Sequence, residues 1–471
     1  MNIKTILQFS IGPIGAALLS LITLPFVAWF FSVEDVGRLT MLQVVLGLSV
    51  SLFSLAMHQA YVREYHEEED KAALLKLCIL PGLVLLTSIS LLILLLPFSI
   101  SAALFGLDSG LLTFLLLAGI FASFFINFLA HVIRMEERGL AFSATKLAPK
   151  LLLLILISLI MLLNLTATFI NLMLINTLSI VFSLLIFTWL TRDSWVIAIA
   201  KSVNYTLLKK LLRYSLPLVA GGIAYWGLTT MDRFFLRSLS GFEELGVYAL
   251  ASALAGAVSV LTSIFSSLWH PILYKWTKDG VDEKKVQNVI ESMVIAVAMI
   301  WSLVGLFSFL IPFFLPPQYV AIKYLIVACV SMPLFYLLSE TTGVGIGITR
   351  RSSYAMLASI MAFLINAILN YLLIPKYGAS GAALATVISF FVFFVIKTES
   401  SARLWFSLPR LRIYVVVICY MLATTAMVLT KGSTFSYKTI WLALLLMVFI
   451  LFYERLKKLW CYFTAYLKNG G

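Results

Sequence analysis

The sequence RYSLPLVAGGIAYWGLTTMDRFFLRSLSGFEELGVYALASAL, residues 213–254, holds the features around which the rest of the chain can be interpreted. It begins with an apolar segment that is long enough to cross a bilayer and is interrupted by Pro217, Gly221 and Gly222. A turn with two glutamates and Gly246 follows, and a second apolar segment begins there. Consecutive apolar segments of this length, joined by a tight turn, are typical of membrane proteins that cross the bilayer many times.

The composition of the whole chain agrees with that interpretation. Hydrophobic residues make up 62% of the sequence, charged residues only 12%, and the mean hydropathy is +1.04. These values exclude an ordinary soluble globular protein. Pattern and length predict an all-α protein of about 14 spans, with roughly 12 as the lower limit. The predicted spans are 6–30, 39–62, 77–102, 111–133, 147–165, 168–190, 214–238, 246–273, 287–314, 320–348, 353–374, 379–398, 413–430 and 439–454.

The net charge of +13 has a simple source in the way membrane proteins are oriented. Most of the 34 Lys and Arg residues, Lys397 among them, fall on one side of the predicted spans. Because cytoplasmic loops carry the excess of Lys and Arg, this distribution predicts that both termini are cytoplasmic. It also removes the need to invoke nucleic acid as a partner.

The opening stretch is one copy of an internal repeat. SIGPIG at 10–15 corresponds to SLPLVAGG at 215–222, and EDVG at 34–37 corresponds to EELG at 243–246. An even number of spans separates the copies, so both halves enter the membrane from the same side. Such a parallel repeat has a pseudo-two-fold axis along the membrane normal, and interrupted helices in matched positions indicate a transporter's binding region. Pro and Gly are also common in membrane helices for reasons of packing.

The repeat divides the chain into four predicted parts. These are an N-lobe of six spans, a cytoplasmic linker along the membrane surface, a C-lobe of six spans, and two further spans with a cytoplasmic tail. Their boundaries are 1–192, 193–213, 214–404 and 405–471.

Three motifs resemble a known family of exporters. MDRFFL at 231–236, GVYALA at 246–251 and IPKYGASGAA at 374–383 are similar to segments of O-antigen and polysaccharide repeat-unit flippases, in the multidrug/oligosaccharidyl-lipid/polysaccharide (MOP) superfamily. The resemblance implies two six-helix lobes that alternate in access around a central cavity. It implies a transporter and not an enzyme, in the bacterial inner membrane, with undecaprenyl-pyrophosphate-linked oligosaccharide as substrate. It further implies a role in O-antigen or lipopolysaccharide biosynthesis, with a polymerase and a chain-length regulator as partners. The last two spans are an addition to the twelve common in that family.

Charged residues on the seventh span are the first candidates for a binding site. Arg233 and Arg237 are four residues apart and therefore share one helix face. Two guanidinium groups suit a pyrophosphate, because Arg pairs with phosphate oxygens in a bidentate manner. We expect Asp232, which lies about 100° around the helix from Arg233, to pair with a neighbouring helix and hold the arginines in place. The alternative is that both arginines extend to the outer membrane interface.

Other candidates lie nearer the cytoplasmic side. His58, Gln59 and Arg63 at the end of the second span, and Arg134 in the fourth, could meet a phosphate or a sugar at the entrance. Each could equally be an ordinary interfacial residue. Glu340 is the acid of the tenth span, and a carboxylate within a membrane helix is a candidate for proton or cation coupling. It could instead be salt-bridged to a basic residue of another span.

The sequence therefore predicts a lipid-linked oligosaccharide flippase with no cofactor, no metal site and no catalytic residues. A multidrug cation antiporter of the same superfamily is the main alternative, but it should expose acidic residues, whereas most charges within the spans are basic. A membrane polysaccharide polymerase or ligase should carry a large external loop, and the predicted external loops are short.

Overall fold

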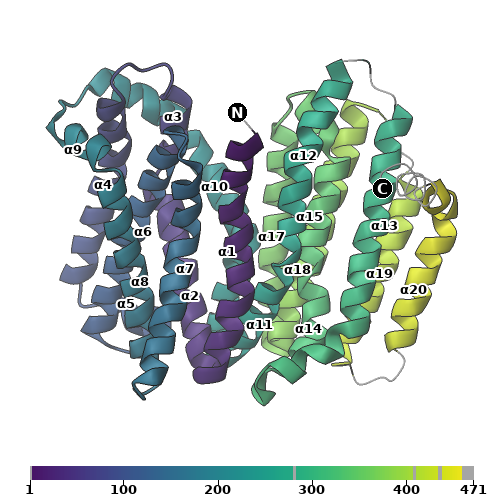
Figure 1. Cartoon of the computed structure of the whole chain (residues 1–471). Coiled ribbons are helices and arrows are strands. Elements are labelled where there is room, and N and C mark those ends of the chain that lie inside the picture. The colour runs from purple at the N-terminus through teal and green to yellow at the C-terminus, as the bar shows by residue number, and fades with distance from the viewer. Residues whose placement is uncertain (1–2, 279, 281–282, 407–409, 433–436, 459–471) are drawn as a thin grey trace. The chain divides into compact units, whose positions relative to one another are not determined.

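The protein is described by a computed structural model over residues 3–278, 280, 283–406, 410–432 and 437–458. Every regular element in these ranges is a helix (Figure 1). The predicted all-α class is therefore confirmed. By their contacts, the residues group into two compact units, Met1–Gly246 and Val247–Gly471.

The first unit runs from α1 to the start of α11. Its helices are α1 (Ile3–Phe30), α2 (Val33–Phe53), α3 (Met57–Glu64), α4 (Lys71–Leu95), α5 (Ile100–Phe105), α6 (Gly110–Met135), α7 (Gly139–Leu162), α8 (Phe169–Leu190), α9 (Arg192–Ala200), α10 (Tyr205–Leu239) and the beginning of α11 (Phe242–Ala255).

The second unit continues from α11 to α20. Its further helices are α12 (Val258–Lys278), α13 (Glu283–Phe307), the 3-10 helices η1 (Ser308–Phe314) and η2 (Pro317–Tyr319), α14 (Ile322–Cys329), α15 (Ser331–Thr342), α16 (Val344–Ile348), α17 (Ser353–Tyr377), α18 (Ala379–Leu404), α19 (Leu411–Leu429) and α20 (Tyr437–Leu451).

Helices occupy all of the predicted spans, but not all of them are typical spans. Among the described residues, 10 helical segments are long and apolar enough to cross a membrane, and α11 with α12, joined at a 43° bend, would make an eleventh. Ile14–Phe30 of α1 and the whole of α20 are apolar but shorter. The remaining predicted span coincides with α10, in which glycines, threonines and charged residues interrupt the apolar sequence. The chain is thus a multi-pass membrane protein.

Several segments that we predicted as continuous spans are broken. The second span is interrupted at Leu55 and Ala56, which have φ of 48° and 52°. This left-handed backbone separates α2 from α3. The tenth span is divided into α14, α15 and α16. The predicted linker 193–213 contains α9 and the first turns of α10, so half of it continues directly into the seventh span.

Side-chain caps explain where many of the helices begin. Ser32 accepts a hydrogen bond from the backbone N–H of Asp35, and Asp70 accepts one from Ala73, at the starts of α2 and α4. Asn204 does the same at α10 with two N–H groups. These contacts satisfy N–H donors that have no partner inside the helix. Short polar residues before an apolar run therefore fix the helix starts.

The repeated turn motifs pack against each other within the first unit. A Cβ added to Gly37 would lie 2.1 Å from the carbonyl oxygen of Phe242, and one added to Gly246 would lie 2.2 Å from that of Val33. Only glycine permits so close a backbone approach. The two copies of the motif thus bring the start of α2 against residues 242–246.

Candidate functional site

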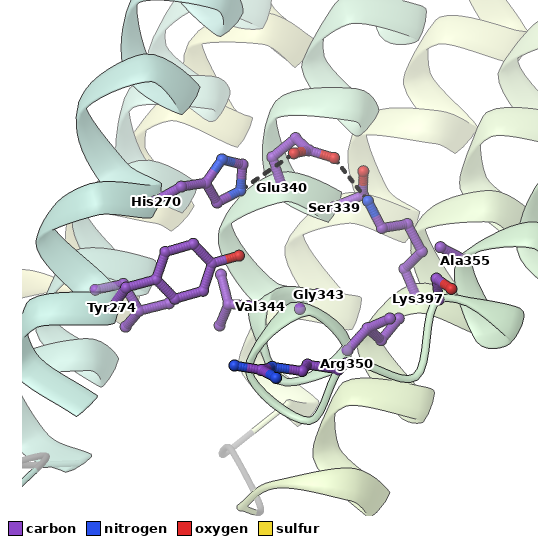
Figure 2. A pocket seen from close by; sticks show the side chains of 13 residues that line it. His270, Tyr274, Ser339, Glu340, Gly343, Val344, Arg350, Ala355 and Lys397 are labelled. Atoms are coloured by element: carbon purple, nitrogen blue, oxygen red, sulfur yellow. Dashed lines mark hydrogen bonds and ion pairs between the residues drawn. The ribbon is translucent and has the colours of Figure 1, made fainter. Parts of the chain in front are cut away.

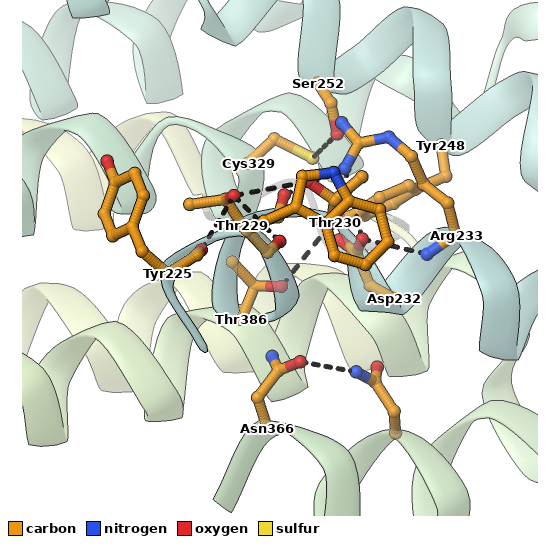
Figure 3. Close-up of polar contacts among 12 residues, drawn as sticks. Tyr225, Thr229, Thr230, Asp232, Arg233, Tyr248, Ser252, Cys329, Asn366 and Thr386 are labelled. Atoms are coloured by element: carbon orange, nitrogen blue, oxygen red, sulfur yellow. Dashed lines mark hydrogen bonds and ion pairs between the residues drawn. The ribbon is translucent and has the colours of Figure 1, made fainter. Parts of the chain in front are cut away.

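Helix α10 carries the arginines that we predicted as a pyrophosphate site. Arg233 Nη1 donates to the carbonyl oxygen of Thr229 at 3.0 Å and lies 3.1 Å from Asp232 Oδ1 (Figure 3). The Arg233 side chain is 20% exposed and that of Asp232 only 6%. Asp232 Oδ1 also accepts from the Arg233 backbone N–H at 2.9 Å. Asp232 therefore holds Arg233 from the same helix.

Arg237 lies one turn further along in a different environment. Its guanidinium carbon is 5.5 Å from the centre of the Phe242 ring, and Arg38 lies 5.0 Å from the same ring centre. Arg38 forms ion pairs with Glu34 at 2.8 Å and Asp35 at 2.9 Å. The Nε atom of Arg237, in contrast, is buried and has no hydrogen-bond partner among the described residues. The Arg237 guanidinium group therefore has an N–H donor, at Nε, that has no acceptor among the described residues.

The glycines of α10 lie in open surroundings. A Cβ added to Gly221 or Gly222 would meet no described atom within 4 Å. Their counterparts in α1 are tightly packed, since a Cβ on Gly12 would lie 2.7 Å from the Cα of Ser143 in α7. The matched Gly-rich segments thus differ: the first serves helix packing, and the second leaves free space beside α10.

His58 comes close to a second histidine. Its ring centre is 4.9 Å from that of His131, which is hydrogen-bonded through Nδ1 to the carbonyl oxygen of Asn127 at 2.7 Å. The Nδ1 atom of His58 is buried and has no partner among the described residues. The structure thus joins the ends of the second and fourth predicted spans in one polar group.

The remaining candidates near that end are more exposed. Gln59 and Arg134 are both exposed. Arg63 lies over the ring of Tyr214, with 4.4 Å between its guanidinium carbon and the ring centre. Tyr214 and Arg233 are separated by roughly 28 Å of helix at 1.5 Å per residue. The predicted residues of the first unit therefore form two groups near opposite ends of α10.

Glu340 lies in the second unit, in an ion cluster that joins three helices. Its Oε1 atom is 2.6 Å from Lys397 Nζ on α18, and its Oε2 atom is 3.4 Å from His270 Nε2 on α12 (Figure 2). The side chains of Glu340 and Lys397 are 14% and 11% exposed. The alternative that we considered for Glu340, a salt bridge to another span, is therefore what the structure contains.

A known protein family matches the first part of the chain. The model of the family described as "Polysaccharide biosynthesis protein" matches residues 3–277, which is more than half of the chain. The chain belongs to this family. This match confirms the relation to polysaccharide biosynthesis proteins that the sequence motifs predict.

Two solved structures share the fold of this chain. The lipid II flippase MurJ, in an inward closed conformation, has a TM-score of 0.66 at 15% identity, covering 96% of this chain and 99% of that chain. An inward-facing multidrug resistance MATE family transporter of the MOP superfamily has a TM-score of 0.61 at 17% identity, covering 87% and 98%.

A curated relative matches part of the sequence. An uncharacterized membrane protein of Methanocaldococcus jannaschii is 27% identical over 203 residues, which cover 41% of this chain and 46% of that protein. The chain therefore spans less than half the length of that relative.

The sequence alone did not identify the side chains that pair with Glu340, or a pair of buried asparagines on α17. Lys397, which the charge count assigns to the cytoplasmic side, is buried on α18 and pairs with Glu340. His270 was not considered. On α17, Asn370 Nδ2 donates to Asn366 Oδ1 at 2.8 Å, and both residues are buried (Figure 3). Two Asn residues four apart in an apolar span were a usable signal, because they share one helix face.

Proposed function

We propose that this protein is a flippase for undecaprenyl-pyrophosphate-linked oligosaccharide. It moves O-antigen or other polysaccharide repeat units from the cytoplasmic to the periplasmic leaflet of the bacterial inner membrane, by alternating access, with both termini in the cytoplasm. Membership in the polysaccharide biosynthesis family supports the general role. The lipid-linked product would pass to a polysaccharide polymerase and a chain-length regulator.

The observation that carries the proposal is the excess of positive charge on α10. Two guanidinium groups share one face, while Asp232 is the one acid of this helix. Asp232 contacts Arg233, and the Nε of Arg237 is buried without a hydrogen-bond partner among the described residues. A cation left in this state inside a membrane protein favours an anionic ligand. Arg matches the planar, bidentate geometry of phosphate oxygens better than Lys does.

The charged residues of α10, its unpacked glycines and an exposed tyrosine support the proposal that this helix lines a hydrophilic path. It carries more charged residues than α4, α6 or α8. Gly221 and Gly222 leave space at its surface, and Tyr225 is exposed. Aromatic rings and hydroxyl groups suit a glycan, while the polyprenyl tail would remain in the bilayer.

At the entrance, the proposal assigns His58, Gln59, Arg63 and Arg134 to early contacts with the headgroup. The exposure of Gln59 and Arg134 supports this assignment. Outward movement is also favoured electrically, because each negative charge that leaves a negative-inside cell gains about 2.3 kcal/mol per 100 mV.

A proton or a cation exchanged at Glu340 is a separate part of the proposal. Its ion pair with Lys397 gives it a positive partner already, so a bound cation would have to compete with an ammonium group at 2.6 Å. Protonation of Glu340 would instead release Lys397. A proton is therefore the better candidate for a coupling ion.

The test is complementation of a bacterial strain that lacks its own O-antigen flippase. Surface polysaccharide is compared for the intact chain, for Arg233→Ala with Arg237→Ala, and for Lys323→Ala with Lys376→Ala, all at matched expression. The control removes the same charge from α14 and α17. We expect the intact chain and the control to restore polysaccharide and the arginine variant to lose at least tenfold. Resistance to cationic drugs without polysaccharide would instead support the antiporter alternative.

A further inference from the structure

The second unit contains a cavity with charged side chains in its lining, apart from the residues that we propose for the substrate path. Its volume is about 440 Å³. It lies between α12, α15, α16, the start of α17 and α18, all within residues 247–471. Pockets of roughly 300–1,000 Å³ are the usual size for small-molecule sites.

The charges that line this cavity are unevenly balanced. Glu340 is its acidic residue, and Lys397, His270 and Arg350 are its basic ones. Lys397 lies 2.6 Å from Glu340 Oε1 and compensates its charge. Arg350 forms no ion pair with any described residue, and it is exposed. The charge that remains available in the cavity is therefore positive, even with His270 neutral.

Arg350 is held at the cavity by a backbone conformation that arginine rarely adopts. Its φ is 57°, and its N–H donates to the carbonyl oxygen of Gly347 at 3.1 Å in the connection between α16 and α17. A left-handed conformation in a residue other than Gly, Asn or Asp is unfavourable and concentrates at functional sites. Figure 2 shows the Arg350 guanidinium group below the Tyr274 ring, at the opposite end of the view from Glu340.

Hydroxyl groups add neutral donors to this charge. Tyr274 lines the cavity, and its hydroxyl oxygen would lie 2.9 Å from a Cβ added to Gly347. Glycine at this position therefore lets the phenol approach the backbone closely. Ser352 also lines the cavity. A guanidinium group together with hydroxyl donors is a set that matches an oxyanion, in contrast to a cation.

From this arrangement we propose that the cavity binds a phosphate group. Arg350 and Tyr274 provide the hydrogen-bond donors. Lys397 is a further cation in the cavity, and its ion pair with Glu340 keeps it from the phosphate. The ligand is either free phosphate or the phosphate of an anionic lipid headgroup. The site lies wholly within residues 247–471 and does not depend on the proposed transport function.

The test uses the full-length protein in nanodiscs of zwitterionic phosphatidylcholine. Binding of radiolabelled inorganic phosphate is measured by equilibrium dialysis at constant ionic strength. A second arm adds phosphatidic acid to the nanodiscs and counts retained anionic lipids by native mass spectrometry. Binding in the first arm identifies free phosphate as the ligand, and binding in the second arm alone identifies a lipid.

Variants connect the binding to these residues. Arg350→Gln should weaken phosphate binding at least tenfold, and Arg351→Gln, at the neighbouring exposed position that does not line the cavity, should change it less than twofold. Glu340→Gln should strengthen binding severalfold, because Lys397 is then free to contact the anion. A purely structural role for Glu340 would not produce a gain.

The proposal is overturned if the intact protein binds phosphate in neither arm. It is equally overturned if Arg350→Gln and Arg351→Gln bind as well as the intact protein. Arg350 is exposed, so the Arg350→Gln variant should fold normally, and elution from a sizing column checks this.

Discussion

The two units of this protein hold their membrane-buried charges in different ways. On α10, Asp232 contacts the residue next to it in sequence, and Arg237 rests on an aromatic ring. In the second unit, Glu340 contacts Lys397 and His270, so its charge connects α15 with α18 and α12. The ion pair of Asp232 with Arg233 lies within α10, whereas the contacts of Glu340 connect three helices to each other.

That difference separates charges that stabilise a fold from charges that are available to a ligand. Breaking a contact within one helix leaves the helix packing unchanged. Breaking a buried contact between helices leaves an uncompensated charge and removes a link between them. We therefore expect the Glu340 cluster to dominate stability and α10 to dominate transport.

The largest effect should come from Lys397→Met. It leaves the buried Glu340 carboxylate without its closest cation, which costs about 3–5 kcal/mol when one partner of a buried pair is removed. The loss is measured from unfolding of the purified protein in mild detergent. Adding Glu340→Gln to Lys397→Met should recover much of the stability, and no recovery would mean that packing and not charge explains the loss.

A smaller effect is expected from Asp232→Asn on α10. The change removes charge-assisted hydrogen bonds to Arg233, which are worth about 1.5–3 kcal/mol. The same unfolding measurement provides the value. If Asp232→Asn cost as much as Lys397→Met, the distinction between the local and the cross-helix arrangement would be wrong.

Glycine substitutions sharpen the same comparison through packing. A Cβ at Gly343 would lie 2.5 Å from the Ser339 carbonyl oxygen and 3.0 Å from Lys397 Cε. Gly343→Ala should therefore cost about 1–3 kcal/mol through overpacking. Gly222→Ala has open space and should stabilise α10 by about 0.5–1 kcal/mol. Equal shifts in unfolding would show that α10 is as closely packed as the Glu340 cluster.

The smallest effect belongs to an exposed ion pair that serves as a reference. Lys201 Nζ lies 2.8 Å from Asp70 Oδ2, and the hydrogen bond from the Lys201 side chain lowers the pKa of Asp70 below its usual 3.8. Because the folded pKa is depressed, the stabilisation is present above pH 3.8 and is lost as the pH falls through the folded value. The intact protein and Asp70→Asn should differ slightly in melting temperature at pH 6 and converge at lower pH. A constant difference would contradict this assignment.

The sequence predicted the helical class and the location of nearly every span, because an apolar run of about 20 residues crosses a bilayer as a helix. It also located the repeated glycines, although not their mutual packing. It could not show that Leu55 and Ala56 break the second span, since neither residue type normally adopts a left-handed backbone. Nor could it pair Glu340 with Lys397, because 57 residues separate them in the chain. Such pairings depend on which helices become neighbours.

The lobe boundaries remain a prediction. We placed the seventh span in the C-lobe, and contacts group α10 with residues 1–246, where it packs on α2, α3 and α4. The sequence repeat relates α10 to α1 as the first helix of a second copy, whereas the contacts show that α10 packs on helices of the first copy. The roles of Arg233, Arg237 and the entrance residues likewise remain predictions.

The most direct test of the central claim is translocation in proteoliposomes. Lipid-pyrophosphate-linked oligosaccharide is placed in both leaflets, and its accessibility to an external glycan-binding protein is followed over time. The intact protein and Lys323→Ala with Lys376→Ala should expose the inner pool at similar rates, and Arg233→Ala with Arg237→Ala should be at least tenfold slower at equal melting temperature. Equal rates for the arginine variant and the intact protein would contradict the assignment of α10 to the substrate path.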